Sequence, residues 1–149
     1  MNKLVDLFIK YKHELWEYTG QHFSDEEVAD WFADYSADNT VKIIPICKFG
    51  NPIGFVVIQD IDWKVNKYIV DCYIEPEYRR QGVMTSHLET ILASEIGNNV
   101  CMYVIKNNEP AVEFWRKFFG DHGYKVKLGK GLPEMEVEEN ELFYICKRG

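Results

Sequence analysis

The chain has 149 residues, a formal net charge of −7 and a pI near 5.1, and 46% of its residues are hydrophobic and 28% charged. This size and composition exclude a disordered chain and suit one folded unit, so we expect residues 1–149 to form a single domain. The acidic balance disfavours nucleic acid as a partner and favours a ligand with a basic or amine group.

Targeting and metal-binding patterns are also excluded. No apolar run approaches the length of a membrane span, and the charged start of the chain lacks a signal-peptide core. The four cysteines stand singly in apolar, strand-like runs, which favours buried free thiols in a reducing compartment. No histidine is spaced with Cys or Asp as metal ligands are. We therefore expect a cytoplasmic protein with no metal and no membrane partner.

Two amphipathic helices are expected first. Residues 3–18 place apolar side chains, Tyr11 among them, at helical spacing, and Gly20 follows as a stop. The second helix begins with Ser24 and Glu27, which have the spacing of a capping box. The aromatic side chains of these helices indicate core positions.

Three strands follow, because the apolar pattern changes to β-branched runs at 41–48, 53–60 and 66–74. Short turns join them, so we expect antiparallel pairing. Pro45 cannot donate to a strand ladder, which predicts that the first strand is bulged or lies at an edge of the sheet.

The second half of the chain alternates helices with strands. Strand 66–74, a helix over 83–96 and strand 99–105 form a βαβ unit with parallel strands. A helix over 108–123 follows, and a polar, acidic loop separates the last two strands, 124–128 and 141–147. The predicted fold class is α/β (α+β): a mixed, mostly antiparallel sheet flanked by helices, with the βαβ unit at its centre.

The sequence RRQGVMT, residues 79–85, joins strand to helix inside this unit. Arg79 and Arg80 add positive charge, Gly82 lets backbone approach a ligand closely, and Thr85 carries a hydroxyl donor. The free N–H groups and positive dipole at a helix start favour an anion. One interpretation is a cradle for phosphate or pyrophosphate, and the alternative is a tight turn with solvated arginines.

These residues also carry a family resemblance. RRQGVM resembles the pyrophosphate loop of the GNAT superfamily of CoA-dependent N-acyltransferases, whose pattern is [RQ]-x-x-G-x-[GA]. Further along, NEPAVEFWRKFFGDHGY resembles the second signature of that family through Asn108, Ala111, Phe114–Trp115 and Gly123–Tyr124. The match is strongest over residues 53–126, and the two motifs together at this spacing are more specific than either alone.

The resemblance implies one GNAT-like acyl-CoA N-acyltransferase domain that uses acetyl-CoA as co-substrate. Strands 66–74 and 99–105 would splay apart, and the pantetheine arm would lie between them, with Asn108 contacting it from one side. Backbone N–H groups of residues 81–85 would hold the pyrophosphate. The cofactor-binding residues that the resemblance implies are Ile74, Arg79, Arg80, Gln81, Gly82, Val83, Met84, Thr85, Asn108 and Trp115.

The chain departs from the family pattern in three places. Met84 replaces the usual Gly or Ala, and its position on the apolar stripe predicts that it points into the core. The chain opens with a helix where the family usually has a strand. Trp115 stands where many members carry a tyrosine that protonates the departing thiolate, and an indole N–H is not a usable acid.

Acetyl transfer to an amine needs a base and a means to stabilise the thiolate. The candidate catalytic residues are Asp71 in the middle of strand 66–74, Glu75 at its end, and Tyr73 as a substitute acid, with Tyr103 given less weight. Each also has an ordinary interpretation, as a solvated carboxylate or a packing tyrosine. Cys72 is discounted as a nucleophile, because direct transfer needs no covalent intermediate.

The predicted function is N-acetylation of a primary amine, either on a small cationic molecule or on a lysine or peptide. Acidic runs at 24–27 and 134–141 would suit such an acceptor, although a solvated face is the preferred explanation of each run taken alone. The alternative is a catalytically weak or inactive module of the same fold that binds acyl-CoA or a protein. The sequence leaves the oligomeric state open, with a homodimer as one arrangement.

Overall fold

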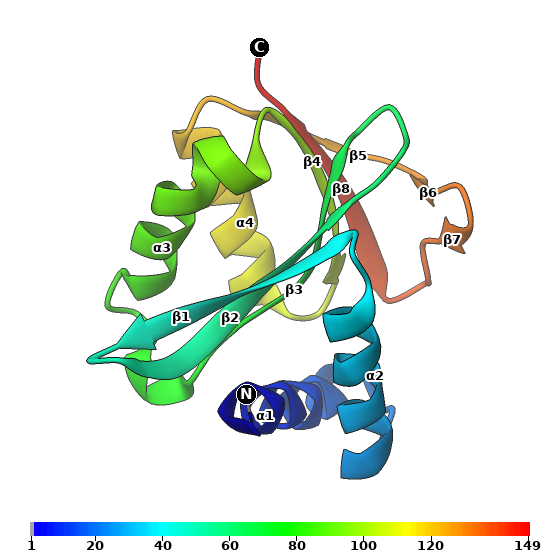
Figure 1. Cartoon of the computed structure of the whole chain (residues 1–149). Helices are drawn as coiled ribbons and strands as arrows, with labels where there is room; N and C mark the ends of the chain where they lie inside the picture. Colours follow the sequence, from blue (N-terminus) through cyan, green and yellow to red (C-terminus); the bar gives the residue numbers. More distant parts are fainter. Residues whose placement is uncertain (1) are drawn as a thin grey trace.

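The computed structural model describes residues 2–149 (Figure 1). Its elements follow the predicted order of two helices, three strands, a helix, a strand, a helix and two closing strands. Their bounds are α1 (Asn2–Thr19), α2 (Asp25–Ala37), β1 (Val41–Lys48), β2 (Asn51–Asp60), β3 (Lys67–Ile74), η1 (Pro76–Tyr78), α3 (Val83–Ile91), η2 (Leu92–Ile96), β4 (Asn99–Ile105), α4 (Glu109–Asp121), β5 (Lys125–Leu128), β6 (Gly131–Leu132), β7 (Met135–Glu136) and β8 (Glu141–Lys147).

Six strands form one mixed sheet in the order β1-β2-β3-β4-β8-β5. Every neighbouring pair is antiparallel except β3 and β4, which are parallel and joined through α3, so the predicted βαβ unit is confirmed. Strand β1 is an edge strand, as Pro45 indicated, and the register shift in its hairpin leaves Ile53 of β2 as the extra residue.

Helices cover both faces of the sheet (Figure 1). On one face, α3 and α4 bury Leu88 and Phe119 against a core that includes Met102 of β4. On the other face, α1 and α2 bury Phe8 and Phe32 against β2 and β3. The amphipathic stripes read from the sequence therefore point toward the sheet, and the predicted mixed sheet with flanking helices is confirmed.

Two predicted elements differ from the structure. The expected helix 83–96 is α-helical only to Ile91 and continues to Ile96 as a π-helical turn, η2, before Gly97 ends it at a positive φ of 72°. The expected polar loop between the last two strands contains the short hairpin β6–β7. The Tyr103 hydroxyl holds this hairpin, because it accepts from Leu132 N–H at 2.8 Å and donates to the Met135 carbonyl.

The parallel strands β3 and β4 part soon after they meet. They pair only at Lys67↔Val100, Tyr68↔Cys101 and Ile69↔Met102. Beyond Ile69, a register shift between β2 and β3 leaves Val70 as an extra residue, and β3 then follows β2 to Ile74 while β4 follows β8. The implied splaying is confirmed, and it leaves one edge of β3 free over its last residues.

The expectation for the cysteines was correct only in part. Cys101 and Cys146 are buried and Cys72 is half-buried, whereas Cys47 is exposed near the end of the edge strand β1. All four are free thiols. Over residues 2–149, none of the helices combines the length and the apolarity that crossing a membrane requires.

Candidate functional site

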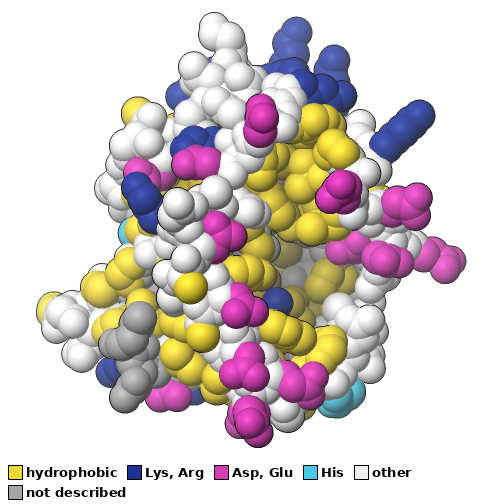
Figure 2. All heavy atoms as spheres, turned by 45° about the vertical axis from the view of Figure 1, so that its right-hand side comes forward, with side chains coloured by type: hydrophobic (Ala, Val, Ile, Leu, Met, Phe, Trp, Pro, Cys, Tyr) yellow, Lys and Arg dark blue, Asp and Glu magenta, His cyan; other side chains and the backbone are white. Residues whose placement is uncertain are grey.

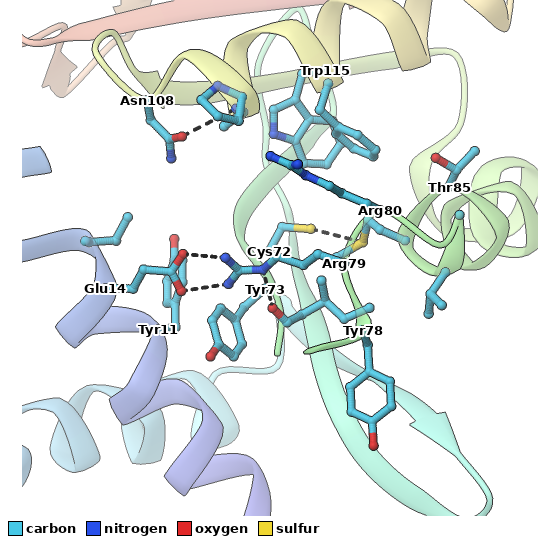
Figure 3. Close-up of a pocket in the computed structure, with 18 of the residues that line it drawn as sticks. Tyr11, Glu14, Cys72, Tyr73, Tyr78, Arg79, Arg80, Thr85, Asn108 and Trp115 are labelled. Atoms are coloured by element: carbon cyan, nitrogen blue, oxygen red, sulfur yellow. Dashed lines mark hydrogen bonds and ion pairs between the residues drawn. The ribbon is translucent and has the colours of Figure 1, made fainter. Parts of the chain in front are cut away.

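A cavity of about 500 Å³ lies where β3 and β4 separate (Figure 3). Strand β3 forms one wall through Cys72 and Tyr73, and α4 contributes Asn108, at its start, and Trp115. Residues of α1 and the start of α3 complete the lining. The splayed strands therefore create the space, and elements distant in the sequence close it.

The amino end of α3 opens into this cavity. Gly82 has φ 74° and ψ 8°, the left-handed conformation, and a Cβ there would meet no atom within 4 Å. Its backbone conformation, rather than crowding, explains the glycine. The first hydrogen bond of the helix runs from Ser86 N–H to Gly82 O at 2.9 Å, so the N–H groups of Val83, Met84 and Thr85 have no partner within the helix. These groups and the helix dipole favour an anion, as predicted.

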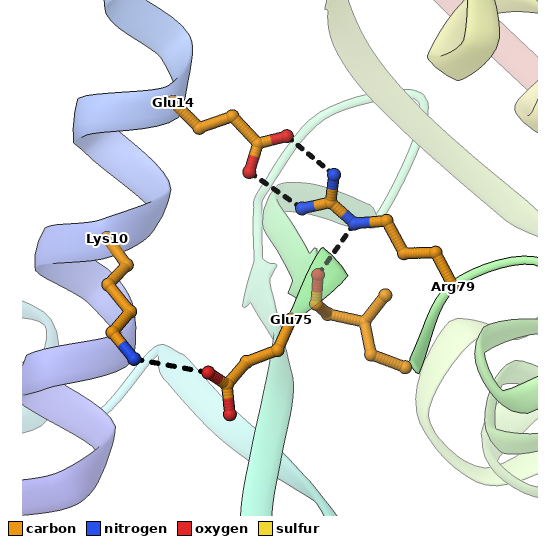
Figure 4. Close-up of polar contacts among 5 residues, drawn as sticks. Lys10, Glu14, Glu75 and Arg79 are labelled. Atoms are coloured by element: carbon orange, nitrogen blue, oxygen red, sulfur yellow. Dashed lines mark hydrogen bonds and ion pairs between the residues drawn. The ribbon is translucent and has the colours of Figure 1, made fainter. Parts of the chain in front are cut away.

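The two arginines of the loop have different environments. Both line the cavity, but the Arg79 guanidinium donates to both carboxylate oxygens of Glu14 at 2.7 Å (Figures 3 and 4). Arg79 Nε also donates to the Ile74 carbonyl at 2.8 Å. Arg80 is exposed at a positive φ of 62°, and no ion pair ties it to another residue of the 2–149 region. The positive charge available to an anionic ligand is therefore that of Arg80.

Met84 and Cys72 meet beside the cavity, with 3.4 Å between the two sulfur atoms (Figure 3). Met84 packs against the α3–α4 core but also lines the cavity, so the prediction that it points away into the core was only partly right. Burial raises the pKa of the Cys72 thiol far above its ordinary value, which keeps it protonated and unreactive.

The α4 side of the cavity carries the second sequence motif. Asn108 is the N-cap of α4, and its Oδ1 lies 3.4 Å from the Ala111 N–H that donates to it. Trp115 is 8% exposed and stacks on Phe119 with 5.9 Å between ring centroids. Both residues thus stabilise α4 as well as facing the cavity.

Asp71 is the one charged residue buried within the described chain, at 7% exposure. Its Oδ1 accepts from the Tyr11 hydroxyl at 2.7 Å and lies 3.7 Å from Lys12 Nζ, while its Oδ2 has no hydrogen-bond partner among residues 2–149. Burial raises the pKa of this carboxyl, and Lys12 and Tyr11 oppose that rise without cancelling it. Asp71 does not itself line the cavity, but Tyr11 does.

Tyr11 is a residue that the sequence interpretation assigned only to the core. Its ring does pack there, edge-on to Phe55 with 5.7 Å between ring centroids. Its hydroxyl, however, connects the buried carboxylate of Asp71 to the cavity. One sequence feature could have indicated this role: Tyr11 carries a hydroxyl although it lies on the apolar face of α1, where a buried hydroxyl needs a hydrogen-bond partner.

Other predicted site residues lie outside the lining of the cavity. Glu75 is half-buried and forms an ion pair with Lys10 at 3.1 Å (Figure 4). The Gln81 side chain is exposed and donates to the Glu77 carbonyl at 2.9 Å. Tyr103 is engaged with the β6–β7 hairpin. Tyr73 does line the cavity, with its ring 5.4 Å from the Arg79 guanidinium carbon.

The splayed parallel strands, the glycine-led helix start and the cavity between them are the features that the resemblance to the GNAT superfamily implies. Comparison with protein families gives a match to the acetyltransferase (GNAT) family over residues 8–121. The chain therefore belongs to the GNAT acetyltransferase family. A search of curated proteins gave no match.

Solved structures confirm the fold over nearly the whole chain. An acetyltransferase from Thermus thermophilus has a TM-score of 0.71 at 14% identity, with 95% of this chain and 88% of that chain covered. The PaiA N-acetyltransferase from Thermoplasma acidophilum, in complex with coenzyme A, has a TM-score of 0.62 at 16% identity, covering 98% and 91%. The diaminobutyrate acetyltransferase EctA from Paenibacillus lautus, in complex with L-2,4-diaminobutyric acid and coenzyme A, has a TM-score of 0.59 at 15% identity, covering 93% and 90%.

Proposed function

We propose that the chain is an N-acetyltransferase that moves an acetyl group from acetyl-CoA to a primary amine by direct attack. The observation that carries this proposal is the cavity of about 500 Å³ between the amino end of α3 and the separated strands β3 and β4. Such a space suits a long molecule with a diphosphate at one end and an amide-bearing arm. Membership of the GNAT family and the CoA complexes of structural neighbours support acetyl-CoA as that molecule.

Each part of the coenzyme has a matching group in the chain. The N–H groups of residues 83–85 and the free charge of Arg80 suit the pyrophosphate. The free edge of β3 over residues 72–74 offers backbone groups to the pantetheine arm, which would lie as an added strand. Ile74 would contribute through its N–H, because Arg79 already binds its carbonyl. Asn108 and Trp115 form the wall opposite β3.

The chemistry requires a base for the amine proton and a donor for the oxyanion. Neither candidate carboxylate lines the cavity, but Asp71, two residues past the point where β3 leaves β4, is hydrogen-bonded to the lining residue Tyr11, whereas Glu75 is paired with Lys10. This favours Asp71 as the base. A backbone N–H on the free edge of β3 would stabilise the oxyanion, and the protonated Cys72 takes no covalent part.

A cationic acceptor is favoured by the acidic surface beside the site. Figure 2 shows a hollow lined by hydrophobic side chains, with Asp and Glu side chains at its right and lower margins. A second cavity, of about 730 Å³, adjoins Thr19 at the end of α1 and Ile105 at the end of β4, and Glu138, Glu139 and Glu141 line it. These carboxylates would attract ammonium groups. Two structural neighbours act on or bind such amines, as diaminobutyric acid and spermidine.

The alternative function is an acyl-CoA-binding module without catalysis. The observation that favours it is Trp115, which lines the cavity where a proton-donating tyrosine stands in many family members. The pairing of Arg79 with Glu14 points the same way, because it withdraws one positive charge from the ligand.

The test is release of free CoA thiol from acetyl-CoA with a panel of amines, together with calorimetry of CoA binding. We expect turnover with at least one diamine or polyamine. Gly82→Glu should abolish CoA binding, because a carboxylate at the helix start repels the diphosphate. The matched control is Gly50→Glu, since Gly50 also has a positive φ, at 80°, with no atom within 4 Å of an added Cβ, and lies at the β1–β2 turn. CoA binding without turnover on any amine supports the module, and an unaffected Gly82→Glu variant overturns both functions.

A further inference from the structure

The proposed reaction lacks a proton donor for its leaving group. Trp115 occupies the position of the family's acid, and its N–H is not acidic enough to protonate a thiolate. A departing CoA thiolate is stabilised when a donor lies beside the sulfur. Which residue supplies that donor is a question that rests on the proposed N-acetyltransferase function.

The sulfur is expected at the inner end of the cavity. If the diphosphate lies at the amino end of α3, the arm must run along β3 toward the place where β3 and β4 meet. That place is marked by Ile69, the last residue of β3 that pairs with β4. Asp71 and Cys72 follow after one intervening residue, Val70, so the donor must lie near this stretch of β3.

Four tyrosines line the cavity, and they differ in the groups that lie close to them. The lining tyrosines are Tyr11, Tyr18, Tyr73 and Tyr78. Within residues 2–149, Tyr11 is the one of these whose hydroxyl is hydrogen-bonded to a carboxylate, Asp71 Oδ1 at 2.7 Å. Tyr78 instead packs under Lys48 Nζ, with 5.2 Å between that nitrogen and the ring centroid. Only Tyr11 can therefore be reprotonated through a neighbouring acid.

The Tyr11 side chain is also held rigidly. Its ring meets Phe55 edge-on and Tyr73 at 56°, each with 5.7 Å between ring centroids. These contacts hold the ring of a lining residue in place while its hydroxyl donates to Asp71, and a fixed donor reduces the cost of orienting it during reaction. Figure 3 shows Tyr11 projecting from α1 on the same side of the cavity as Glu14.

We propose that Tyr11 is the catalytic acid that protonates the CoA thiolate, with Asp71 returning the proton to it. The amine lone pair forms the N–C bond to the acetyl carbon, and the C–S bond breaks with its electron pair going to sulfur. Because Tyr11 lines the cavity and Asp71 does not, the Tyr11 hydroxyl takes up the proton lost by the amine as it passes its own proton to Asp71 Oδ1. When the C–S bond breaks, Tyr11 gives a proton to the sulfur and takes one back from Asp71. The net products are the amide and CoA thiol.

The groups around Asp71 are consistent with a transient proton carrier. Lys12 Nζ lies 3.7 Å from Oδ1, and Tyr35 of α2 and Tyr68 of β3 are near enough that burial and the Asp71 charge together raise the pKa of both phenols. Lys12 favours the charged carboxylate, whereas burial favours its protonated form. Tyr35 is a natural comparison for Tyr11, since it lies near the same carboxylate but does not line the cavity.

The test compares Tyr11→Phe with Tyr35→Phe, each of which removes one hydroxyl near Asp71. We expect Tyr11→Phe to lower kcat about 100-fold, with KM for acetyl-CoA changed less than about twofold, and Tyr35→Phe to lower kcat far less. A second measurement titrates the thiolate absorbance of bound CoA against pH. Loss of the Tyr11 hydroxyl should raise the pKa of the bound thiol, and loss of the Tyr35 hydroxyl should leave it unchanged.

Each other outcome has a defined meaning. Equal losses in the two variants mean that Tyr11 only supports Asp71, which overturns the proposal, as does a Tyr11→Phe enzyme with unchanged kcat. If the wild type binds CoA but turns over no amine, the proposed function fails, and the titration still decides whether Tyr11 touches the sulfur. If the pKa of the bound thiol is unchanged in Tyr11→Phe, the proposal for Tyr11 is overturned, whereas the proposed N-acetyltransferase function stands. No binding of CoA to the wild type overturns both.

Discussion

Glu14 of α1 binds Arg79 of the β3–α3 loop through two parallel hydrogen bonds of 2.7 Å (Figure 4). Beside them, Lys10 and Glu75 form a second ion pair between the same two elements. The Glu14 and Arg79 side chains are each about one third exposed, so water screens the pair and its net contribution to stability is modest. Arg79 therefore ties the β3–α3 loop to α1, whereas the Arg80 side chain is exposed and carries no ion pair within the described residues.

The first prediction separates the two arginines. Arg80→Gln should weaken CoA binding about five- to tenfold at low salt, because a charge-assisted contact to phosphate is lost, and the difference should shrink at high salt. Arg79→Gln should instead lower the free energy of unfolding by about 1 kcal/mol or less, with a smaller effect on CoA affinity. Calorimetry and urea denaturation measure the two effects, and a larger loss of affinity in Arg79→Gln would contradict this division of roles.

A second prediction concerns the β1–β2 hairpin. Its two turn residues, Phe49 and Gly50, have φ of 53° and 80°, and Phe49 is 92% exposed. A non-glycine residue in the left-handed region costs about 1 kcal/mol, and this turn type prefers Asn-Gly. Phe49→Asn should therefore raise the free energy of unfolding by about 1 kcal/mol. Phe49→Ala, which keeps the unfavourable backbone, is the control, and urea denaturation that shows Phe49→Asn to be the less stable variant would refute the explanation.

The third prediction is a pH dependence of stability at Asp71. Burial raises the pKa of this carboxyl in the folded state, so the group favours the fold most fully below its ordinary pKa of about 3.9. That contribution is lost as the pH rises through the higher pKa of the folded protein. Asn at this position does not titrate, so the stability of Asp71→Asn relative to wild type should increase from pH 4 to pH 7. Urea denaturation at several pH values checks this, and a relative stability that stays constant with pH would disprove the raised pKa.

The fourth prediction concerns Trp115 of α4, which stands where many members of the GNAT family carry a tyrosine. Trp115→Tyr supplies an acid where many relatives carry one. In the Tyr11→Phe background it should restore kcat at least about tenfold, whereas in the wild-type background it should add little, because Tyr11 already serves. Trp115→Phe is the control, since it removes similar volume without adding a hydroxyl. Steady-state kinetics of the four combinations measures this coupling, and strictly additive effects would speak against a shared role.

Much of the fold is readable from local patterns in the sequence. The change from helical spacing in residues 3–18 to β-branched runs after Val41 identifies the elements in order, and the glycine at 82 identifies the start of α3. The capping box of Ser24 and Glu27 is present as expected. These features depend on neighbours a few residues apart, which is why the sequence alone predicts them.

The features that sequence patterns missed depend on contacts between distant segments. Arg79 finds Glu14 and Tyr11 finds Asp71 across 65 and 60 residues, and neither pairing has a local signature. The two-residue strands β6 and β7 are too short to show periodicity, and a tyrosine from β4 holds them. The glycine-led start of α3 was therefore predicted from the sequence, whereas the pairing of individual carboxylates with arginine and tyrosine side chains needed the folded chain.

The brief pairing of β3 with β4 has a consequence for the lifetime of the protein. Three residue pairs join one half of the sheet, β1 to β3, to the other half, β4 with β8 and β5. A molecule that lies in the gap and binds both edges would connect the two halves of the sheet. It would stabilise the folded state, and at saturating concentrations the gain in stability grows with the logarithm of its concentration. When that molecule is scarce, the β3–β4 pairing would open more often and expose the chain to proteases. The abundance of the protein would therefore follow the supply of its ligand.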